Sequence, residues 1–141
     1  MIDDSTWYIT MEFLKKKSDA VQNVKYYLTQ LISHDRKPKS ICINHGKEFL
    51  NENLMAWCHD KGITIQNTAP YSPSQNSVAK RMNQTPVEIA QAMIHGSPEF
   101  LWEYVINHSS YLHNQAYTKS LKNQTPYEKW FKKKPNISHL Q

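Results

Sequence analysis

Cysteine, glycine and long apolar runs are all scarce in this chain of 141 residues. Only two cysteines, Cys42 and Cys58, and three glycines occur. No apolar stretch is long enough for a signal peptide or a membrane span, so we expect an intracellular protein with no membrane partner. Acidic residues are also outnumbered, at 12 Asp and Glu against 17 Lys and Arg, which leaves a net charge of +5. This balance indicates a polyanionic partner or simply a basic surface.

The length of the chain suits one compact domain, so we expect a single domain over residues 1–141. An apolar fraction of 39%, with four Trp and eight Tyr, supplies enough material for a core. No segment has the biased composition of a disordered tail, and no internal repeat is visible.

The first half of the chain is predicted to alternate between strands and helices. Its β-branched, aromatic and alternating apolar residues indicate strands at 7–14, 40–44 and 63–67. One helix should begin with Ser18 as its N-cap, and a second should cover 51–61 and stop at Gly62. The residues expected to face inward are Val21, Val24, Leu28 and Leu31 in the first helix and Leu54, Trp57 and Cys58 in the second.

The second half is predicted to be helical. Ser77 can cap a helix whose inward residues are Val78, Met82, Ile89 and Met93. Pro86 lies inside this helix, where it removes a hydrogen bond at a cost of about 3 kcal/mol, so we expect a kink or a break. A further helix opens at Ser97 and Pro98, with Leu101, Val105 and Leu112 inward. Thr125 and Pro126 open a last short helix that ends at residues 132–134.

Five segments resemble, in order, landmarks of the integrase core of Ty1/copia-type retrotransposons. They are FLKKKSDA, NHGKEF, TAPYSPSQNSVAKRMNQT, LWEYVINHSSYLHNQ and TPYEKWFKKKPNISHL, and they cover nearly the whole chain. The resemblance implies an α/β, RNase H-like fold whose ancestral role is DNA integration, with three carboxylates that hold two Mg²⁺ or Mn²⁺ ions. Since the chain begins at the family's turn before the third strand, it also implies a helix-rich core lacking its first strand and most of its second.

Two of the three carboxylate positions are substituted in register with the family. The Asp of a DNGGEF-like motif corresponds to Asn44, and the Glu of a GVAERMN-like segment corresponds to Lys80. Thirty-five residues lie between these positions, which is the family's own spacing. Divalent ions need anionic oxygen ligands, which neutral and cationic side chains cannot provide. We therefore expect an inactive protein with no catalytic residue, no metal site and no Mg²⁺ or Mn²⁺ cofactor.

The loop and helix around Lys80 are a candidate nucleic-acid interface. The family places this region against DNA, and Arg, Lys and hydroxyl groups make most phosphate contacts. The alternative is a solvated helix end, in which a cation costs only a few tenths of a kcal/mol. The lysine runs at 15–17 and 132–134 either widen the basic surface or are simply solvated. The candidate contact residues are Tyr71, Ser72, Ser74, Gln75, Lys80 and Arg81.

Cys42 and His45, with Cys58 and His59, have the ligand types of a zinc site. However, Cys42 falls within a predicted strand and Cys58 on an apolar helix face, where a free cysteine is ordinarily part of the core. We therefore predict two core cysteines rather than a zinc site.

Two functions remain open from the sequence. The first is an inactive integrase-core protein that retains sequence-independent binding to nucleic acid, with DNA as the partner and the nucleus as its location. The second is a protein-interaction role in which nucleic acid plays no part. Loss of central strands would leave sheet edges unpaired, so a second copy or a strand-complementing partner could fill the gap.

Overall fold

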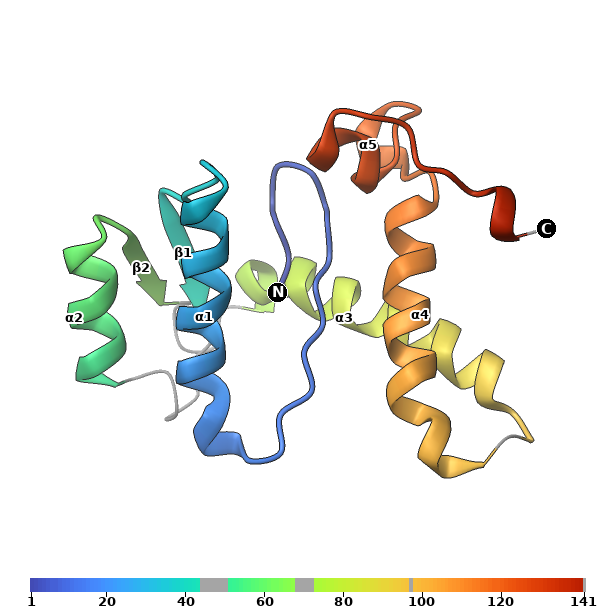
Figure 1. Ribbon diagram of the computed structural model, residues 1–141, viewed down its shortest axis with the longest axis horizontal. Helices are drawn as coiled ribbons and strands as arrows, with labels where there is room; N and C mark the ends of the chain where they lie inside the picture. The colour runs from blue at the N-terminus through green and yellow to red at the C-terminus, as the bar shows by residue number, and fades with distance from the viewer. Residues whose placement is uncertain (44–50, 68–72, 97, 141) are drawn as a thin grey trace. The chain divides into compact units, whose positions relative to one another are not determined.

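A computed structural model describes residues 1–43, 51–67, 73–96 and 98–140 (Figure 1). None of the helices in these ranges combines the length and apolar character needed to cross a bilayer. The α-helices are α1 (Ala20–Ser33), α2 (Glu52–Asp60), α3 (Pro73–Ile94), α4 (Trp102–Gln115) and α5 (Pro126–Phe131). The strands are β1 (Ser40–Ile43) and β2 (Thr64–Asn67), and short 3-10 turns occur at Lys17–Asp19, Glu99–Leu101, Lys119–Leu121 and Ser138–Leu140.

The chain divides into two compact units. The first, Leu14–Ser77, contains α1, β1, α2 and β2. The second joins Met1–Phe13 to Val78–Gln141 and contains most of α3 together with α4 and α5. The single domain expected over residues 1–141 stays a prediction.

Parallel pairing of β1 and β2 organises the unit Leu14–Ser77. The register runs from Ser40 opposite Thr64 to Ile43 opposite Asn67. Its buried core cluster is Leu28, Leu54, Cys58 and Ile63, and the partly buried residues packed against it are Val21, Val24, Leu31, Ile32, Ile41, Trp57 and Ile65. The inward faces predicted for α1 and α2 are thus confirmed, as are two of the three predicted strands.

Both ends of α2 carry strong local signals. The Asn51 side-chain oxygen accepts a hydrogen bond from the backbone N–H of Asn53 at 2.8 Å and caps the helix. Gly62 follows the helix at φ +62°, a conformation that glycine adopts without steric cost. The Ile63 N–H then donates to the Cys58 carbonyl at 2.8 Å, so the chain turns directly into β2.

α1 begins later than predicted. Lys17–Asp19 form a 3-10 turn, and Asp19 rather than Ser18 is the residue before the helix. The Ser18 hydroxyl donates to the Asp19 carboxylate at 3.2 Å. Because this hydroxyl bonds its neighbour, it does not cap the helix.

α3 is more continuous than predicted. It begins at Pro73 rather than at Ser77, since proline is tolerated in the first turn of a helix. It also runs through Pro86 without the expected break. Pro86 is fully buried, and burial of its ring offsets part of the lost hydrogen bond. Ala90 is buried as well, whereas Met93, predicted to face inward, is 41% exposed.

Residues 7–14 do not form the predicted strand. Tyr8 to Thr10 instead belong to a short hairpin with Met1 to Asp3, which contains an isolated antiparallel bridge between Ile2 and Ile9. The Asp3 N–H donates to the Tyr8 carbonyl at 3.0 Å, and the Thr10 N–H donates to the Met1 carbonyl at 2.9 Å. β-branched and aromatic residues favour extended backbone, but a longer strand needs a neighbour along its whole length.

A buried amide on α4 completes the hydrogen bonding of this hairpin. The Asn114 side chain accepts from the Ile9 N–H at 2.9 Å and donates to the Ile9 carbonyl at 2.8 Å. It therefore supplies both hydrogen bonds that a neighbouring strand would supply. Ile9 and Asn114 are 2% and 5% exposed, and without this contact two buried backbone groups would lose their partner.

The inner face of α4 is more polar than predicted. The three apolar residues expected to face inward, Leu101, Val105 and Leu112, are only half-buried. The buried residues are Ile106, Ser109, Ser110, His113 and Asn114. The hydroxyls of Ser109 and Ser110 donate to the Ile106 carbonyl at 2.7 and 3.0 Å, so their burial leaves no hydroxyl proton without an acceptor.

α5 begins and ends as predicted. The Thr125 hydroxyl oxygen accepts from the Glu128 N–H at 3.0 Å, while the Glu128 carboxylate accepts from the Thr125 N–H at 2.8 Å. This reciprocal capping box satisfies two N–H groups that a helix start leaves unpaired, and Pro126 lacks the third. Lys132, at φ +58°, ends the helix.

Candidate nucleic-acid interface

Three of the positions singled out in the sequence follow β1 or β2 along the chain. Ile43 and Asn67 are register partners at the ends of β1 and β2, and parallel strands end on the same edge of a sheet. Asn44 follows Ile43 directly and lies outside the described residues. Tyr71 and Ser72 also lie outside them. These three positions therefore remain assigned by sequence alone.

Four of the predicted contact residues belong to α3. Ser74 and Gln75 lie in its first turn, not in the loop where the sequence placed them. Lys80 and Arg81 follow about 10 Å further along the helix axis, at 1.5 Å per residue. The structure describes the backbone of Ser74, Gln75 and Lys80, and it also describes the side chain of Arg81, which is exposed.

The charges of α3 are separated along the helix. Lys80 and Arg81 are its basic residues, and its acidic residue, Glu88, comes seven positions after Arg81. The Glu88 carboxylate accepts a hydrogen bond from the Gln84 amide at 2.5 Å, within the later half of the helix. Lys80 and Arg81 are the eighth and ninth residues of α3, beyond the first turn in which the helix dipole acts, so the local positive charge comes from these two residues.

The two cysteines lie in different environments, and only one prediction holds. Cys58 is fully buried in the core cluster, as predicted. Cys42 is exposed, because alternate residues of β1 face opposite sides and its neighbours Ile41 and Ile43 are the half-buried ones. His45 lies outside the described residues. Across the described ranges, no group of three or more His, Cys, Asp or Glu residues could hold a metal ion.

Burial accounts for the shifted pKa values of the side chains in the described ranges. It raises the pKa of the Cys58 thiol, and Lys25 partly opposes that shift. Burial also lowers the pKa of the His113 imidazole, whose Nε2 atom is buried without a hydrogen-bond partner among the described residues. Both groups belong to packed interiors, so these shifts do not indicate an acid–base pair at α3.

The lysine runs at 15–17 and 132–134 are exposed in the structure. They belong to different compact units. Their exposure is compatible with either a basic binding surface or simple solvation, the two interpretations that the sequence left open.

Two plant transposon proteins are similar to almost the whole chain. The Pol polyprotein of transposon TNT 1-94 from Nicotiana tabacum is 30% identical over 143 aligned residues, which cover 99% of this chain and 11% of that protein. The Pol polyprotein of transposon RE2 from Arabidopsis thaliana is 27% identical, over 99% of this chain and 10% of that protein. The chain thus spans about a tenth of the length of these relatives. No family model matches it.

Solved structures show the fold. The catalytic core of HTLV-2 integrase, described in complex with magnesium and in a trimeric form, aligns with a TM-score of 0.68 and 16% identity. That alignment covers 90% of this chain and 79% of the core. The chain has an integrase catalytic-core fold. A chain of the simian T-cell lymphotropic virus intasome, solved with the PP2A regulatory subunit B56 gamma, aligns over 90% of this chain and 45% of its own length, with a TM-score of 0.75 and 15% identity.

The integrase-core fold and the transposon relatives agree with the resemblance read from the sequence. The chain is similar to copia-type transposon Pol proteins, and its architecture is helix-rich with a small parallel sheet. Position 44 directly follows β1 in the sequence, and position 80 lies on α3. The activity, substrates and partners of the much longer relatives are properties of whole proteins, of which this chain matches about a tenth.

Sequence reasoning missed a group of polar residues on the inner side of α4. Asn114 was not singled out, although it holds Ile9 through both backbone groups. The neighbouring Gln115 has a buried side-chain oxygen with no partner among the described residues. The available signal was helical spacing, since Ser109, Ser110, His113 and Asn114 follow Ile106 at three, four, seven and eight positions and so share its face. Buried polar residues on one face usually indicate buried hydrogen bonding.

Proposed function

We propose that this integrase-core relative no longer catalyses DNA integration and binds nucleic acid through electrostatic contacts with the first half of α3. The observation that carries the proposal is the pair of substitutions at Asn44 and Lys80 within an integrase-core fold. The second of them places a cation beside Arg81 where the family has a carboxylate. A local change of two charge units favours a polyanion over a metal ion.

Loss of catalysis follows from the charge of the metal ligands. Two divalent ions that flank a transferred phosphoryl group need several carboxylates close together. At 4 Å and an effective dielectric of about 20, a cation such as Lys80 costs about 4 kcal/mol against one unit charge and about twice that against a divalent ion. We expect no joining of a labelled DNA end by the unmodified protein with Mg²⁺ or Mn²⁺. Metal-dependent joining would contradict this part of the proposal.

Nucleic-acid binding is tested by fluorescence anisotropy with two DNA duplexes of unrelated sequence over a series of salt concentrations. We expect similar dissociation constants for both duplexes, about 10⁻⁴ to 10⁻⁶ M at physiological salt, because phosphate contacts carry no sequence information. The double variant Lys80→Glu/Arg81→Glu should weaken binding to both duplexes. It should also flatten the plot of log affinity against log salt by about one to two units.

A matched control uses the lysine run at residues 15–17. Lys15→Glu/Lys16→Glu makes the same change in net charge on exposed residues outside α3. If α3 is the interface, this control should weaken binding much less than the α3 variant. Equal effects of both variants would instead mean that only the total charge matters, and absence of binding at low salt would remove the proposal.

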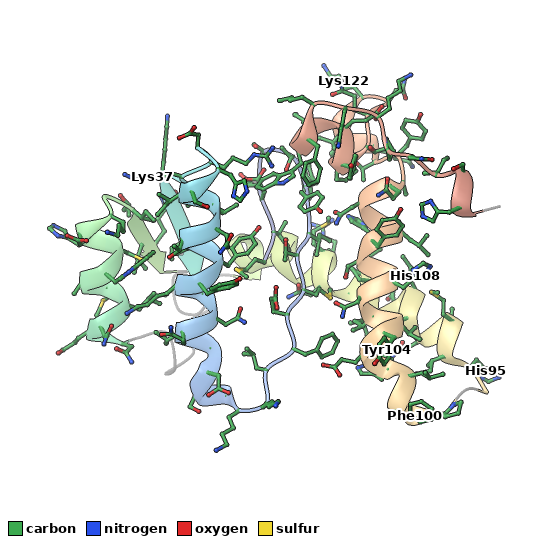
Figure 2. The ribbon with its side chains drawn as sticks, in the orientation of Figure 1. Lys37, His95, Phe100, Tyr104, His108 and Lys122 are labelled. Carbon is green, nitrogen blue, oxygen red and sulfur yellow. The ribbon has the colours of Figure 1, made fainter. Side chains whose placement is uncertain are left out.

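A protein-interaction function is favoured by exposed aromatic side chains on α4 and on the 3-10 turn before it. Phe100 and Tyr104 are 76% and 72% exposed, and His108 is exposed one turn further on (Figure 2). These residues recur every four positions, so they form one stripe on the outer side of the helix. Large exposed aromatic side chains of this kind are typical of interaction surfaces.

This second function is distinguished by measuring association without DNA. Sedimentation velocity of the protein and of Phe100→Ser/Tyr104→Ser would show whether the stripe mediates self-association. If it does, the double substitution should reduce the associated fraction. Under the nucleic-acid proposal, the same substitution should leave anisotropy titrations with duplex DNA unchanged.

A further inference from the structure

A pocket of about 280 Å³ lies within the unit that joins Met1–Phe13 to Val78–Gln141. Its walls come from the extended segment after the hairpin turn and from the facing sides of α4 and α5. Besides Asn114, its lining includes four aromatic rings and two side-chain amides. They are Tyr8, Tyr111, Tyr127 and Phe131, with Asn107 and Gln115.

The aromatic rings of the pocket are held in place by one another. Tyr127 and Phe131 have ring centroids 4.6 Å apart, and Phe131 meets Tyr8 edge to face at 5.7 Å and 86°. Tyr8 also stacks on Trp130 at 5.2 Å, outside the pocket lining. Tyr127 and Phe131 are inclined at 40° to each other, so a flat ligand can stack on the face of one of them and touch the other obliquely. Rings fixed by such contacts lose little conformational freedom when a ligand binds.

Gln115 lines the pocket, and its side-chain oxygen is buried with no partner among the described residues. A small rotation of the side chain would present this acceptor to a ligand. The adjacent amide, Asn114, is fully engaged by the backbone of Ile9. An unpaired buried acceptor is unfavourable, and a ligand that presents an N–H group would relieve it.

The charges around the pocket favour an anionic ligand. The residues that line it include neither an acid nor a base. Lys129 belongs to α5, and the exposed lysines of 132–134 follow Phe131 directly. Two acids lie close by in the chain: Glu128, whose carboxylate is engaged by the Thr125 N–H in the capping box, and Glu12, which follows Met11 of the lining and interacts with the Met1 amino group. A cationic ligand would meet no carboxylate in the pocket wall, whereas a phosphate-bearing ligand has lysines close by in the chain.

We propose that this pocket binds one unpaired base of a single-stranded nucleic acid. Tyr127 and Phe131 supply a stacking surface, and the Gln115 amide oxygen accepts from an N–H on the edge of the base. The exposed lysines of 132–134 contact the flanking phosphates. A base within a duplex cannot present its face, so this site distinguishes single strands from duplexes. The inference rests on the proposed nucleic-acid function and names a ligand class for a second contact.

The first experiment compares single strands of about 12 nucleotides with and without bases. Labelled DNA, RNA and an abasic DNA strand of the same length are titrated by fluorescence anisotropy at one salt concentration. Stacking of one base should make the normal strand bind about 5- to 100-fold more tightly than the abasic strand, which has the same backbone charge. The DNA and RNA arms show which kind of strand is preferred.

The second experiment places the contact in the pocket. Tyr127→Ala should remove most of the difference between the normal and abasic strands, and Tyr127→Phe should keep it because the ring remains. Gln115→Leu removes the acceptor without creating a cavity, so it provides a second test if Tyr127→Ala does not fold. The matched control is Tyr104→Ala, which removes an exposed tyrosine of α4 that does not line the pocket.

The outcomes separate this inference from the α3 proposal. Substitutions in the pocket should leave duplex binding unchanged, and Lys80→Glu/Arg81→Glu should leave the ratio of normal to abasic binding unchanged. Equal binding of normal and abasic strands overturns the inference, as does retention of their difference in both Tyr127→Ala and Gln115→Leu. Loss of duplex binding alone would affect only α3. Binding of neither strand nor duplex would overturn both proposals and favour a protein partner.

Discussion

Each of the two compact units of this chain is stabilised internally by a different kind of interaction. In Leu14–Ser77, apolar side chains of α1, α2 and β2 form one buried cluster around a parallel strand pair. In the unit that joins Met1–Phe13 to Val78–Gln141, the buried face of α4 is largely polar, and an amide clamps the hairpin. The comparison shows that one small fold can rely on periodic apolar burial in one part and on satisfied polar groups in another.

The largest expected effect tests the apolar unit. Leu54 is completely buried in the core cluster, so Leu54→Ala should reduce the free energy of unfolding by about 2 to 5 kcal/mol through lost burial and a residual cavity. Urea unfolding followed by circular dichroism measures it. The neighbouring Met55 is 41% exposed, and Met55→Ala should cost much less. Similar losses in both variants would show that this core is not tightly packed.

The next effect tests the amide clamp of the polar unit. Asn114→Ala removes both hydrogen bonds to the buried Ile9 N–H and carbonyl, each worth about 0.5 to 1.5 kcal/mol, so the free energy of unfolding should fall by about 1 to 3 kcal/mol in total. Hydrogen exchange at the Ile9 amide should become faster, as measured by NMR. Asn114→Asp keeps the acceptor for the Ile9 N–H and loses the donor, so it should protect this amide better than alanine does. Unchanged exchange in Asn114→Ala would mean that the clamp is not formed in solution.

A smaller effect concerns the pH dependence of the same unit. Burial lowers the pKa of His113 below its ordinary value of 6.5, so the folded state favours the neutral imidazole. The unfolded chain takes up the proton first as the pH falls. The stability contributed by neutral His113 is therefore present above about pH 6.5 and is lost from there down to the folded pKa, with a slope of at most about 1.4 kcal/mol per pH unit.

Urea unfolding between pH 7.5 and 5 measures this dependence. His113→Gln should flatten the curve, whereas His108→Gln, at an exposed position of α4, should leave the curve close to that of the unmodified protein. A curve that keeps its slope in His113→Gln would assign the pH dependence to other groups.

The sequence alone predicted the elements whose signals are local. The bounds of α2 and α5 agree with caps and stops at Asn51, Gly62, Thr125 and Lys132, and β1 and β2 agree with short apolar or alternating runs. The resemblance to copia-type integrase cores also came from contiguous segments of residues. That Asn44 and Lys80 stand at carboxylate positions of that family stays a prediction, and it needed only the resemblance, because residue types can be compared without coordinates.

Part of the candidate site could not be predicted because it depends on where an element begins. Pro70 and Pro73, which precede Ser74 and Gln75, led to the prediction of a loop there. However, Pro73 is the first residue of α3. Proline is compatible both with a loop and with the first turn of a helix, so its presence alone does not locate the boundary. Pro86 shows the same ambiguity, since it lies fully buried inside α3, where its burial offsets part of the hydrogen bond that it removes.

Composition, helical spacing and short motifs determined which segments are helical and which residues fill the core of Leu14–Ser77. Only the tertiary structure decided that residues 7–14 form part of a hairpin rather than a strand, that α4 buries serines and an asparagine, and that aromatic rings of α5 meet Gln115 in one pocket. The physical reason is distance along the chain. Apolar periodicity is visible within one helix, whereas Ile9 and Asn114 are 105 residues apart, and only folding brings a buried polar group to its partner.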